Sequence, residues 1–447
     1  MILLANGKLI TRDADGAGYY PDGGVVIDGE KIAAVGETAA LKAQYPQAEF
    51  VDAHGGVIMP GLINAHTHIY SALARGLSIA GNNPTNFYEV LDGTWWAIDR
   101  HLDLEATRAS AQALVIDSIK QGVTTIFDHH ASFCEIPGSL MKIADVTREF
   151  GMRACLCYEV SDRDGEEKCL QAIQENADFI TECEKNKDSM LAAMFGGHAL
   201  FTISDKTFDR MVAANNGRTG YHIHVSEGMN DVYDSLQNYG RRPVQRLQDH
   251  GILGSKTILG HCIHVNTAEM EIIAETGTMV VNNPESNMGN AIGICPVLQL
   301  HTRGILLGMG TDAYTNDMLE SIKVALCSQR SQNCLPNVGW REVTDMLFHN
   351  NAKIGGKYFP DELGVLKAGA AADIIVMDYK PFTPFSDENI DGHMIFGMTG
   401  RQCQTTIAAG KLLMRDRELV GIDEEAENAH ILEAAKKLWG DLNHRVY

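Results

Sequence analysis

Pairs of histidines separated by one residue occur twice in the chain, each time in a short apolar run. His66 and His68 close the segment GVIMPGLINAHTH, and His222 and His224 lie in GYHIHVSE. Residues two apart on a β-strand point to the same side, so each pair can offer two imidazoles to one metal ion. A lone buried histidine is more often a satisfied core residue, so the pairs become informative only if other ligands join them.

Other ionisable residues follow apolar runs of the same kind. Glu227 lies three residues beyond His224, His261 lies in TILGHCIH, and Asp312 follows GILLGMGT. Three neutral imidazoles and one carboxylate suit a divalent ion such as zinc and leave a position for water. The ion would lower the pKa of that water from about 15.7 to roughly 7, so the pattern indicates hydrolytic chemistry.

The elements that must bring these residues together are eight short β-rich runs that alternate with helical patterns. Helical periodicity is clear over 104–122, 138–151 and 167–185. This alternation predicts an α/β fold, a (β/α)8 TIM barrel over residues 57–362, whose active site lies at the C-terminal ends of the strands. The candidate strands end near His68, His130, Val160, Leu200, Glu227, His264, Glu285 and Asp312.

The two ends of the chain have a different pattern. Residues 1–56 and 363–423 contain short alternating strands with glycine turns, and neither segment is long enough to close a core easily by itself. We therefore expect one discontinuous β-sandwich domain built from both, followed by a C-terminal helix over 424–447.

The composition and charge of the chain exclude several classes of protein and of binding partner. The 447 residues carry 37 Lys and Arg against 58 Asp and Glu, a net charge of −21, without a dense basic run, so we expect no nucleic-acid partner. No signal-peptide pattern and no apolar run of membrane-spanning length is present, so we expect no membrane association. The ten cysteines include no C-x-x-C pair, and we interpret them as reduced thiols of a cytoplasmic protein.

Several motifs together resemble the amidohydrolase superfamily, in its aminohydrolase branch of deaminases and chlorohydrolase-like enzymes. The resemblance covers essentially the whole chain, and the overall sequence is most similar to aminohydrolases of the SsnA type. The motifs that carry it are PGLINAHTH (60–68), HVSE (224–227), GHC (260–262), NPESN (283–287), GTD (310–312) and LGVLKAGAAADIIVMD (363–378).

The resemblance implies a role for each residue of these motifs. It implies His66, His68, His224 and Asp312 as metal ligands, and Asp312 also as acceptor of a proton from water. Glu227 would carry that proton to a ring nitrogen or leaving group, and His261 would orient the water and stabilise the oxyanion. Two-metal members use a carbamylated lysine at the end of strand four, which MLAAMFGGHALF lacks. We therefore expect one metal per chain, zinc or iron. The resemblance also implies a homodimer, which is common in the family.

Substrate contacts are predicted from weaker signals. His198 matches the family's substrate-contacting histidine after strand four, and Asp128-His129-His130 resembles the D-H-H of deaminases that act on oxidised purines and hydroxylated triazines. A hydrogen-bonded histidine pair in a loop explains the latter equally well. Trp95 and Trp96 would either cover a flat ring or pack in the core. Taken together, His198, His129, Trp95 and Trp96 favour a small nitrogen heterocycle related to the purines as the substrate.

Three functions fit these residues. The first is hydrolysis of a C–N bond in a heterocycle, by deamination or by ring opening. The second changes the leaving group to a halide or an alkylamine on a triazine-type ring. The third is a non-catalytic barrel protein, since a fold alone does not determine function. Glu227 and Asp312 argue against the third, because a scaffold gains nothing from an acid and a base beside a metal site.

Overall fold

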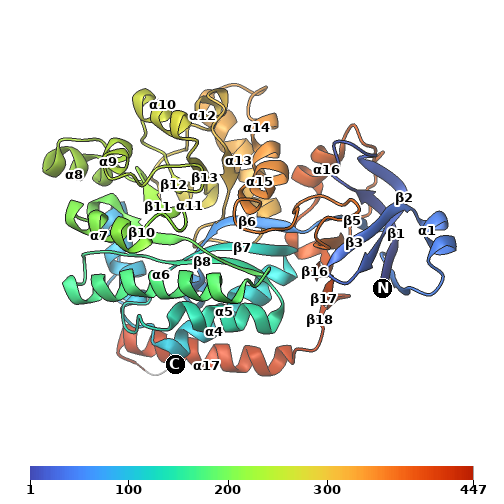
Figure 1. The fold of residues 1–447 in the computed structure, drawn as a ribbon, viewed down its shortest axis with the longest axis horizontal. Coiled ribbons are helices and arrows are strands. Elements are labelled where there is room, and N and C mark those ends of the chain that lie inside the picture. The colour runs from blue at the N-terminus through green and yellow to red at the C-terminus, as the bar shows by residue number, and fades with distance from the viewer. Residues whose placement is uncertain (446–447) are drawn as a thin grey trace.

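The computed structural model describes residues 1–445, and its centre is a barrel of parallel strands surrounded by helices (Figure 1). The strands form two parallel sheets, β6-β7-β8-β9 and β10-β11-β12-β13-β14. Bridges between Thr67 and Asp312 and between Val160 and Gly197 join the two sheets at both seams. The predicted (β/α)8 barrel is confirmed, with the fourth barrel strand divided into β9 and β10. The bounds are β6 Leu62–Thr67, β7 Val123–His130, β8 Arg153–Tyr158, β9 Leu191–Ala193, β10 Phe195–Ala199, β11 Tyr221–Val225, β12 Ile258–His261, β13 Met279–Asn282 and β14 Leu307–Met309.

The helices of the barrel begin and end at residues that satisfy free backbone groups. Asp103 accepts a hydrogen bond from the amide of Ala106 at the start of α4, and Gly151, in the left-handed region, ends α5. The three predicted helices correspond to α4, α5 and α6. The bounds are α4 Leu104–Lys120, α5 Ser139–Phe150, α6 Glu166–Asn186, α7 Asp205–Asn215, α8 Met229–Tyr239, α9 Pro243–Asp249, α10 Thr267–Thr276, α11 Pro284–Gly289, α12 Val297–Thr302, α13 Met318–Asn333, α14 Trp340–Asp345 and α15 Asn351–Gly355.

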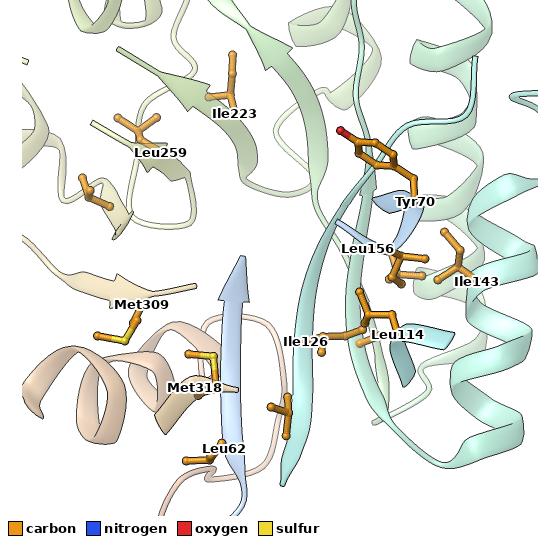
Figure 2. Packing of buried hydrophobic residues seen from close by; sticks show 14 of the residues in the cluster. Leu62, Tyr70, Leu114, Ile126, Ile143, Leu156, Ile223, Leu259, Met309 and Met318 are labelled. Carbon is orange, nitrogen blue, oxygen red and sulfur yellow. The ribbon is translucent and has the colours of Figure 1, made fainter. Parts of the chain in front are cut away.

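Apolar side chains fill the space between strands and helices. Figure 2 shows Ile126 of β7 and Leu156 of β8 beside Leu114 of α4 and Ile143 of α5. All four are at most 4% exposed. Since apolar burial contributes about 25 cal/mol per Å², this packing holds the strands, and the polar residues at their ends, in place.

Strands from both chain ends form one nine-stranded sheet beside the barrel (Figure 1). The strand β15 pairs with β5, which pairs with β1, so the two terminal segments share a sheet and a small apolar core. Because β5 belongs to this sheet, the chain enters the barrel after Pro60, later than the expected residue 57. The bounds are β1 Ile2–Ile10, β2 Tyr19–Asp28, β3 Lys31–Glu37, β4 Glu49–Asp52, β5 Val57–Pro60, β15 Ile374–Met377, β16 Cys403–Ala408, β17 Lys411–Arg415 and β18 Glu418–Leu419, with helix α1 Thr38–Gln44.

The predicted C-terminal helix is α17, Glu424–Asn443, which lies along α4 (Figure 1). Glu427 accepts a hydrogen bond from Gln112 of α4, and the indole of Trp439 donates to the carbonyl of Leu73. Residues 446 and 447 of the predicted helix lie outside the described residues. Within 1–445, no helix combines the length and the apolar character that crossing a membrane requires.

Shorter helical segments complete the chain. After β6 the chain forms η1 and then the run α2-η2-α3, which contains both tryptophans of the predicted pair. The bounds are η1 Ile69–Ala74, α2 Phe87–Val90, η2 Leu91–Trp95, α3 Trp96–Asp99, η3 Leu200–Thr202, η4 Met346–Asn350, α16 Ile390–Gly397 and η5 Gly400–Gln402.

Candidate active site

The four residues implied as metal ligands meet at the C-terminal end of the barrel. His66 lies on β6 and His68 directly follows it, His224 lies on β11, and Asp312 follows β14. Their ligand atoms all lie within 4.8 Å of one another, and all four residues are buried. The barrel therefore gathers three imidazoles and one carboxylate from three different strands.

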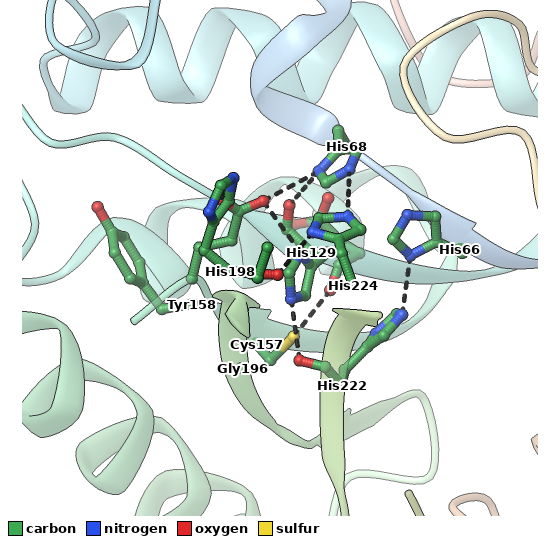
Figure 3. Close-up of polar contacts among 12 residues, drawn as sticks. His66, His68, His129, Cys157, Tyr158, Gly196, His198, His222 and His224 are labelled. Carbon is green, nitrogen blue, oxygen red and sulfur yellow. Dashed lines mark hydrogen bonds and ion pairs between the residues drawn. The ribbon is translucent and has the colours of Figure 1, made fainter. Parts of the chain in front are cut away.

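Backbone carbonyls fix which nitrogen His68 and His224 turn toward this cluster. The Nδ1–H of His68 donates to the carbonyl of His129 at 2.6 Å, and the Nδ1–H of His224 donates to the carbonyl of His198 at 2.8 Å (Figure 3). The two Nε2 atoms then face each other at 3.2 Å. Lone pairs at this distance repel unless a positive charge lies between them, and second-sphere carbonyls of this kind are typical of metal-binding histidines.

The remaining two ligands also fit a cation. Nε2 of His66 has no hydrogen-bond partner among residues 1–445, although it is buried. Asp312 Oδ1 lies 2.8 Å from Nε2 of His68 and 3.6 Å from Nε2 of His66. A divalent ion would satisfy all of these atoms together.

Electrostatics keep two of the three histidines neutral. Burial lowers the pKa of His66 to about 3 and that of His224 well below the usual value. Burial also acts to lower the pKa of His68, but the hydrogen bond and charge of Asp312 outweigh it and raise that pKa to about 9. Without a metal, a proton on His68 would therefore supply the positive charge that the cluster requires.

A second layer of side chains holds the ligands. Nδ1 of His66 lies 2.8 Å from Nε2 of His222, and Ser286 donates its hydroxyl to Oδ2 of Asp312. His222 thus faces His66, although its sequence spacing suggested a metal chelate. Glu159, which directly follows β8, accepts a hydrogen bond from Nδ1 of His129 at 3.0 Å. Sequence reasoning missed Glu159; its only signal was a carboxylate after the apolar run MRACLCY.

Glu227 and His261 lie beside the ligand cluster. Oε1 of Glu227 is 3.6 Å from Nε2 of His261, which is 3.9 Å from Oδ2 of Asp312. Burial and the nearby Asp312 carboxylate raise the pKa of Glu227 well above its usual range, so this carboxyl can hold a proton. The Nδ1–H of His261 donates to Oδ1 of Asn287 at 2.7 Å, so its Nε2 carries a lone pair. This lone pair faces the cluster and also accepts a long hydrogen bond, 3.4 Å, from the side-chain amide of Asn283.

The pocket above the cluster contains only two of the four predicted substrate contacts. His198 and Trp95 line it, together with His68, Tyr70, Phe87, Leu91, Glu159, His224, Glu227, Asn290, Asp312, Ala313 and Tyr314. Trp96 instead packs in the core at 4% exposure, under the guanidinium of Arg163. His129 is fully buried, and its two ring nitrogens contact Glu159 and the carbonyl of His222. The structure therefore places His129 and Trp96 behind the pocket wall, where they support residues that line it.

Known proteins of several activities resemble this chain. A family model described as "Amidohydrolase family" matches residues 57–413, and one described as "Imidazolonepropionase-like composite domain, bacteria" matches residues 23–48. A 5'-deoxyadenosine deaminase of Methanosarcina mazei is 30% identical over 100% of this chain and 99% of its own length. A 5-methylthioadenosine/S-adenosylhomocysteine deaminase of Pelotomaculum thermopropionicum is 29% identical over 98% of both chains.

Solved structures share the fold. The crystal structure of a zinc-bound adenosine deaminase from Xanthomonas campestris superposes with a TM-score of 0.86 at 22% identity and covers 98% of both chains. Guanine deaminase of E. coli gives a TM-score of 0.79 at 20% identity, covering 93% of this chain and 100% of that one. The barrel and its flanking sheet thus occur together in these proteins.

Proposed function

Because the chain belongs to the amidohydrolase family, we propose that it is a metal-dependent aminohydrolase that deaminates a small nitrogen heterocycle related to the purines. The observation that carries the proposal is the position of Glu227. Its carboxyl, whose pKa is raised, lies beside His261, and the residue lines the same pocket as His68, His224 and Asp312. Hydrolysis of a C–N bond needs such a proton carrier next to an activated water.

We propose one zinc ion per chain, held by His66, His68, His224 and Asp312. When bound, the ion would supply a Lewis acid and a water of lowered pKa. Asp312 would accept the proton that the water gives up, and Glu227 would deliver a proton to the ring nitrogen or to the departing amine. His261, with its lone pair toward the cluster, would orient the attacking water through a hydrogen bond.

The pocket supports a flat, nitrogen-rich substrate. Trp95 and Tyr70 provide aromatic surface, and His198 provides a polar edge. Relatives at about 30% identity deaminate adenine-containing nucleosides according to their names. We propose that this chain is an aminohydrolase of the SsnA type and that it removes an amine from a related ring. We further propose that it works as a homodimer in the cytoplasm, which light scattering and cell fractionation would test.

A substrate panel tests the proposal. Zinc-loaded protein is incubated with guanine, 8-oxoguanine, adenine, 5'-deoxyadenosine, aminotriazines and acyclic amides, and ammonia release is measured with the change in ring absorbance. We expect ammonia from at least one heterocycle, at a rate that Glu227→Gln lowers by about 10²- to 10⁴-fold. Release of chloride or alkylamine from substituted triazines, without ammonia from any ring, would assign the alternative leaving group. Turnover of acyclic amides alone would contradict the proposal.

A further inference from the structure

Glu159 presents an unused hydrogen-bond acceptor to the pocket. Its Oε1 contacts Nδ1 of His129 at 3.0 Å, whereas Oε2 has no hydrogen bond from any of residues 1–445. The residue is only 2% exposed, yet it lines the pocket. Because this oxygen accepts no hydrogen bond from the described residues and Glu159 lines the pocket, a donor on a bound ligand can pair with it.

His198 presents a second acceptor beside the first. The hydroxyl of Thr202 donates to the carbonyl of Ala199 at 2.9 Å, so it can only accept from Nδ1 of His198, 2.8 Å away. The proton of the imidazole is therefore on Nδ1, and Nε2 carries a lone pair. Its one donor in residues 1–445 is the indole N–H of Trp96 at 3.5 Å, the outer limit of a hydrogen bond.

The two acceptor atoms lie close together in the lining of the pocket. Oε2 of Glu159 lies 3.8 Å from Nε2 of His198. Nε2–H of His129 donates to the carbonyl of His222 at 2.9 Å, so only Nδ1 of His129 can share a proton with Glu159. Whichever of the two residues holds that shared proton, Oε2 remains an acceptor. Glu159 and His198 therefore cannot satisfy each other, and both can bind donors on a ligand.

This acceptor pair lies close to the metal-ligand candidates. Oε1 of Glu159 is 3.5 Å from Nδ1 of His68, so the carboxylate is one imidazole away from the proposed ion. A group that reaches it belongs to the reacting ring or is attached directly to that ring.

From these contacts we propose that Glu159, acting with His198, selects substrates that present two neighbouring hydrogen-bond donors. The inference rests on the proposed function and adds a specificity-determining residue to it. Two N–H groups of a cyclic urea, as in an oxidised purine, provide such donors, and so does the diol of a ribose. The closeness to the metal-ligand candidates favours the ring N–H groups.

Binding of related rings, compared two at a time, shows whether the two donors are ring N–H groups or the hydroxyl groups of a sugar. Dissociation constants are measured by calorimetry on zinc-loaded Glu227→Gln protein, in which turnover is slow, with and without Glu159→Ala. Guanine has one N–H in its five-membered ring and 8-oxoguanine has two, whereas 5'-deoxyadenosine adds a diol to adenine. We expect 8-oxoguanine to bind at least tenfold more tightly than guanine, and Glu159→Ala to remove that preference. If Glu159→Ala instead removed a preference for 5'-deoxyadenosine over adenine, the two donors would be the hydroxyl groups of the sugar.

Further variants distinguish an effect of Glu159 on substrate preference from an effect on the stability of the protein. Glu159→Gln keeps an oxygen that can accept and should retain part of the preference, and His198→Leu should weaken it even if Glu159→Ala does not fold. Glu175→Ala removes another buried carboxylate, which accepts from the amides of Gly138 and Leu140, and should lower stability without changing preference.

Three outcomes would count against the inference. The same ring preferences with and without Glu159, or no donor preference in the parent protein, would overturn the role of Glu159 and leave the proposed function standing. Failure of the zinc-loaded protein to bind any of the rings would overturn the proposed function as well.

Discussion

At the scale of single residues, the orientation of each site histidine depends on the partner of its second ring nitrogen. Carbonyl oxygens of His129 and His198 hold His68 and His224, and the ring of His222 holds His66. Partners of this kind fix the tautomer and raise the basicity of a ligand. Among the partners of the three histidines implied as metal ligands, His222 is the one that acts through its own side chain, so substitution can test it.

We expect His222→Leu to weaken zinc binding by about 10- to 100-fold, the usual effect of losing a second-sphere partner. The measurement is competition for zinc with a chromophoric chelator, and Glu227→Gln, which leaves the ligands intact, is the control. An affinity equal to that of the parent protein would show that His66 needs no orienting partner.

Glu227→Gln should lose about 10²- to 10⁴-fold in turnover, the usual contribution of a general acid–base group, because an amide cannot transfer a proton. Metal content and melting temperature should stay close to those of the parent. Activity is followed by ammonia release on the substrate found in the panel. Parent-like rates in this variant would remove Glu227 from the mechanism.

His130 gives a pH-dependent contribution to stability. Burial lowers its pKa to about 3, and both ring nitrogens lack hydrogen-bond partners among residues 1–445. The unfolded chain, with a histidine pKa near about 6.5, binds a proton that the folded protein does not. The free energy of unfolding should therefore fall as the pH is lowered from about 6.5 toward 3.

Replacing His130 should reduce this acid sensitivity. Urea unfolding of His130→Leu at pH 5 and pH 7.5 should show a smaller difference in unfolding free energy than in the parent. His430→Leu, on the half-exposed face of α17, controls for the loss of a histidine. Equal pH differences in all three proteins would rule out a contribution from His130.

At the scale of elements, the strand ends turn sharply where the site residues lie. Ser226, His261 and Asp312 all have positive φ, at 49°, 68° and 55°. Non-glycine residues adopt this region only where the surrounding contacts compensate for the strain, and such residues gather at functional sites. The turns after β11, β12 and β14 therefore depend on close packing nearby.

Gly310 provides the test of that packing. A Cβ at this position would lie 2.5 Å from Oδ1 of Asn283 and 2.6 Å from the carbonyl of His66. Gly310→Ala should therefore displace Asp312 and lower both the zinc retained after dialysis and the melting temperature. Gly36→Ala is the control, because its Cβ would meet no atom closer than 3.8 Å. Full zinc retention in Gly310→Ala would contradict this dependence.

The strands and the positions of their terminal residues could be predicted from sequence, because a barrel places every strand end on one face. The contacts that surround those strand ends could not be predicted from sequence. Glu159 precedes Val160 at a strand end with no motif, and its function follows only from contacts with residues 30 and 39 positions away. Trp95 and Trp96 are neighbours in sequence, yet the turn of the helical run places one in the pocket and the other in the core.

At the scale of the whole molecule, an ion at the ligand cluster would connect β6, β11 and the end of β14 across the barrel. Ligands that bind only the folded state stabilise it, by about 4 kcal/mol at a thousandfold excess over the dissociation constant. Chelation should therefore lower the melting temperature by several degrees, and zinc should restore it. His66→Ala should show no such response to zinc. Melting curves that are identical with and without metal would contradict a shared site.

The order in which the terminal sheet can form has a consequence for biosynthesis. Strands β1 to β5 leave the ribosome before the barrel does, but β5 pairs with β15, whose residues 374–377 follow the entire barrel. Until they are translated, the nascent chain carries an open β-edge with unpaired backbone groups, which is a template for aggregation. The nascent protein is therefore most prone to aggregation while its barrel is being made, and the exposure of β5 ends only when β15 has been translated.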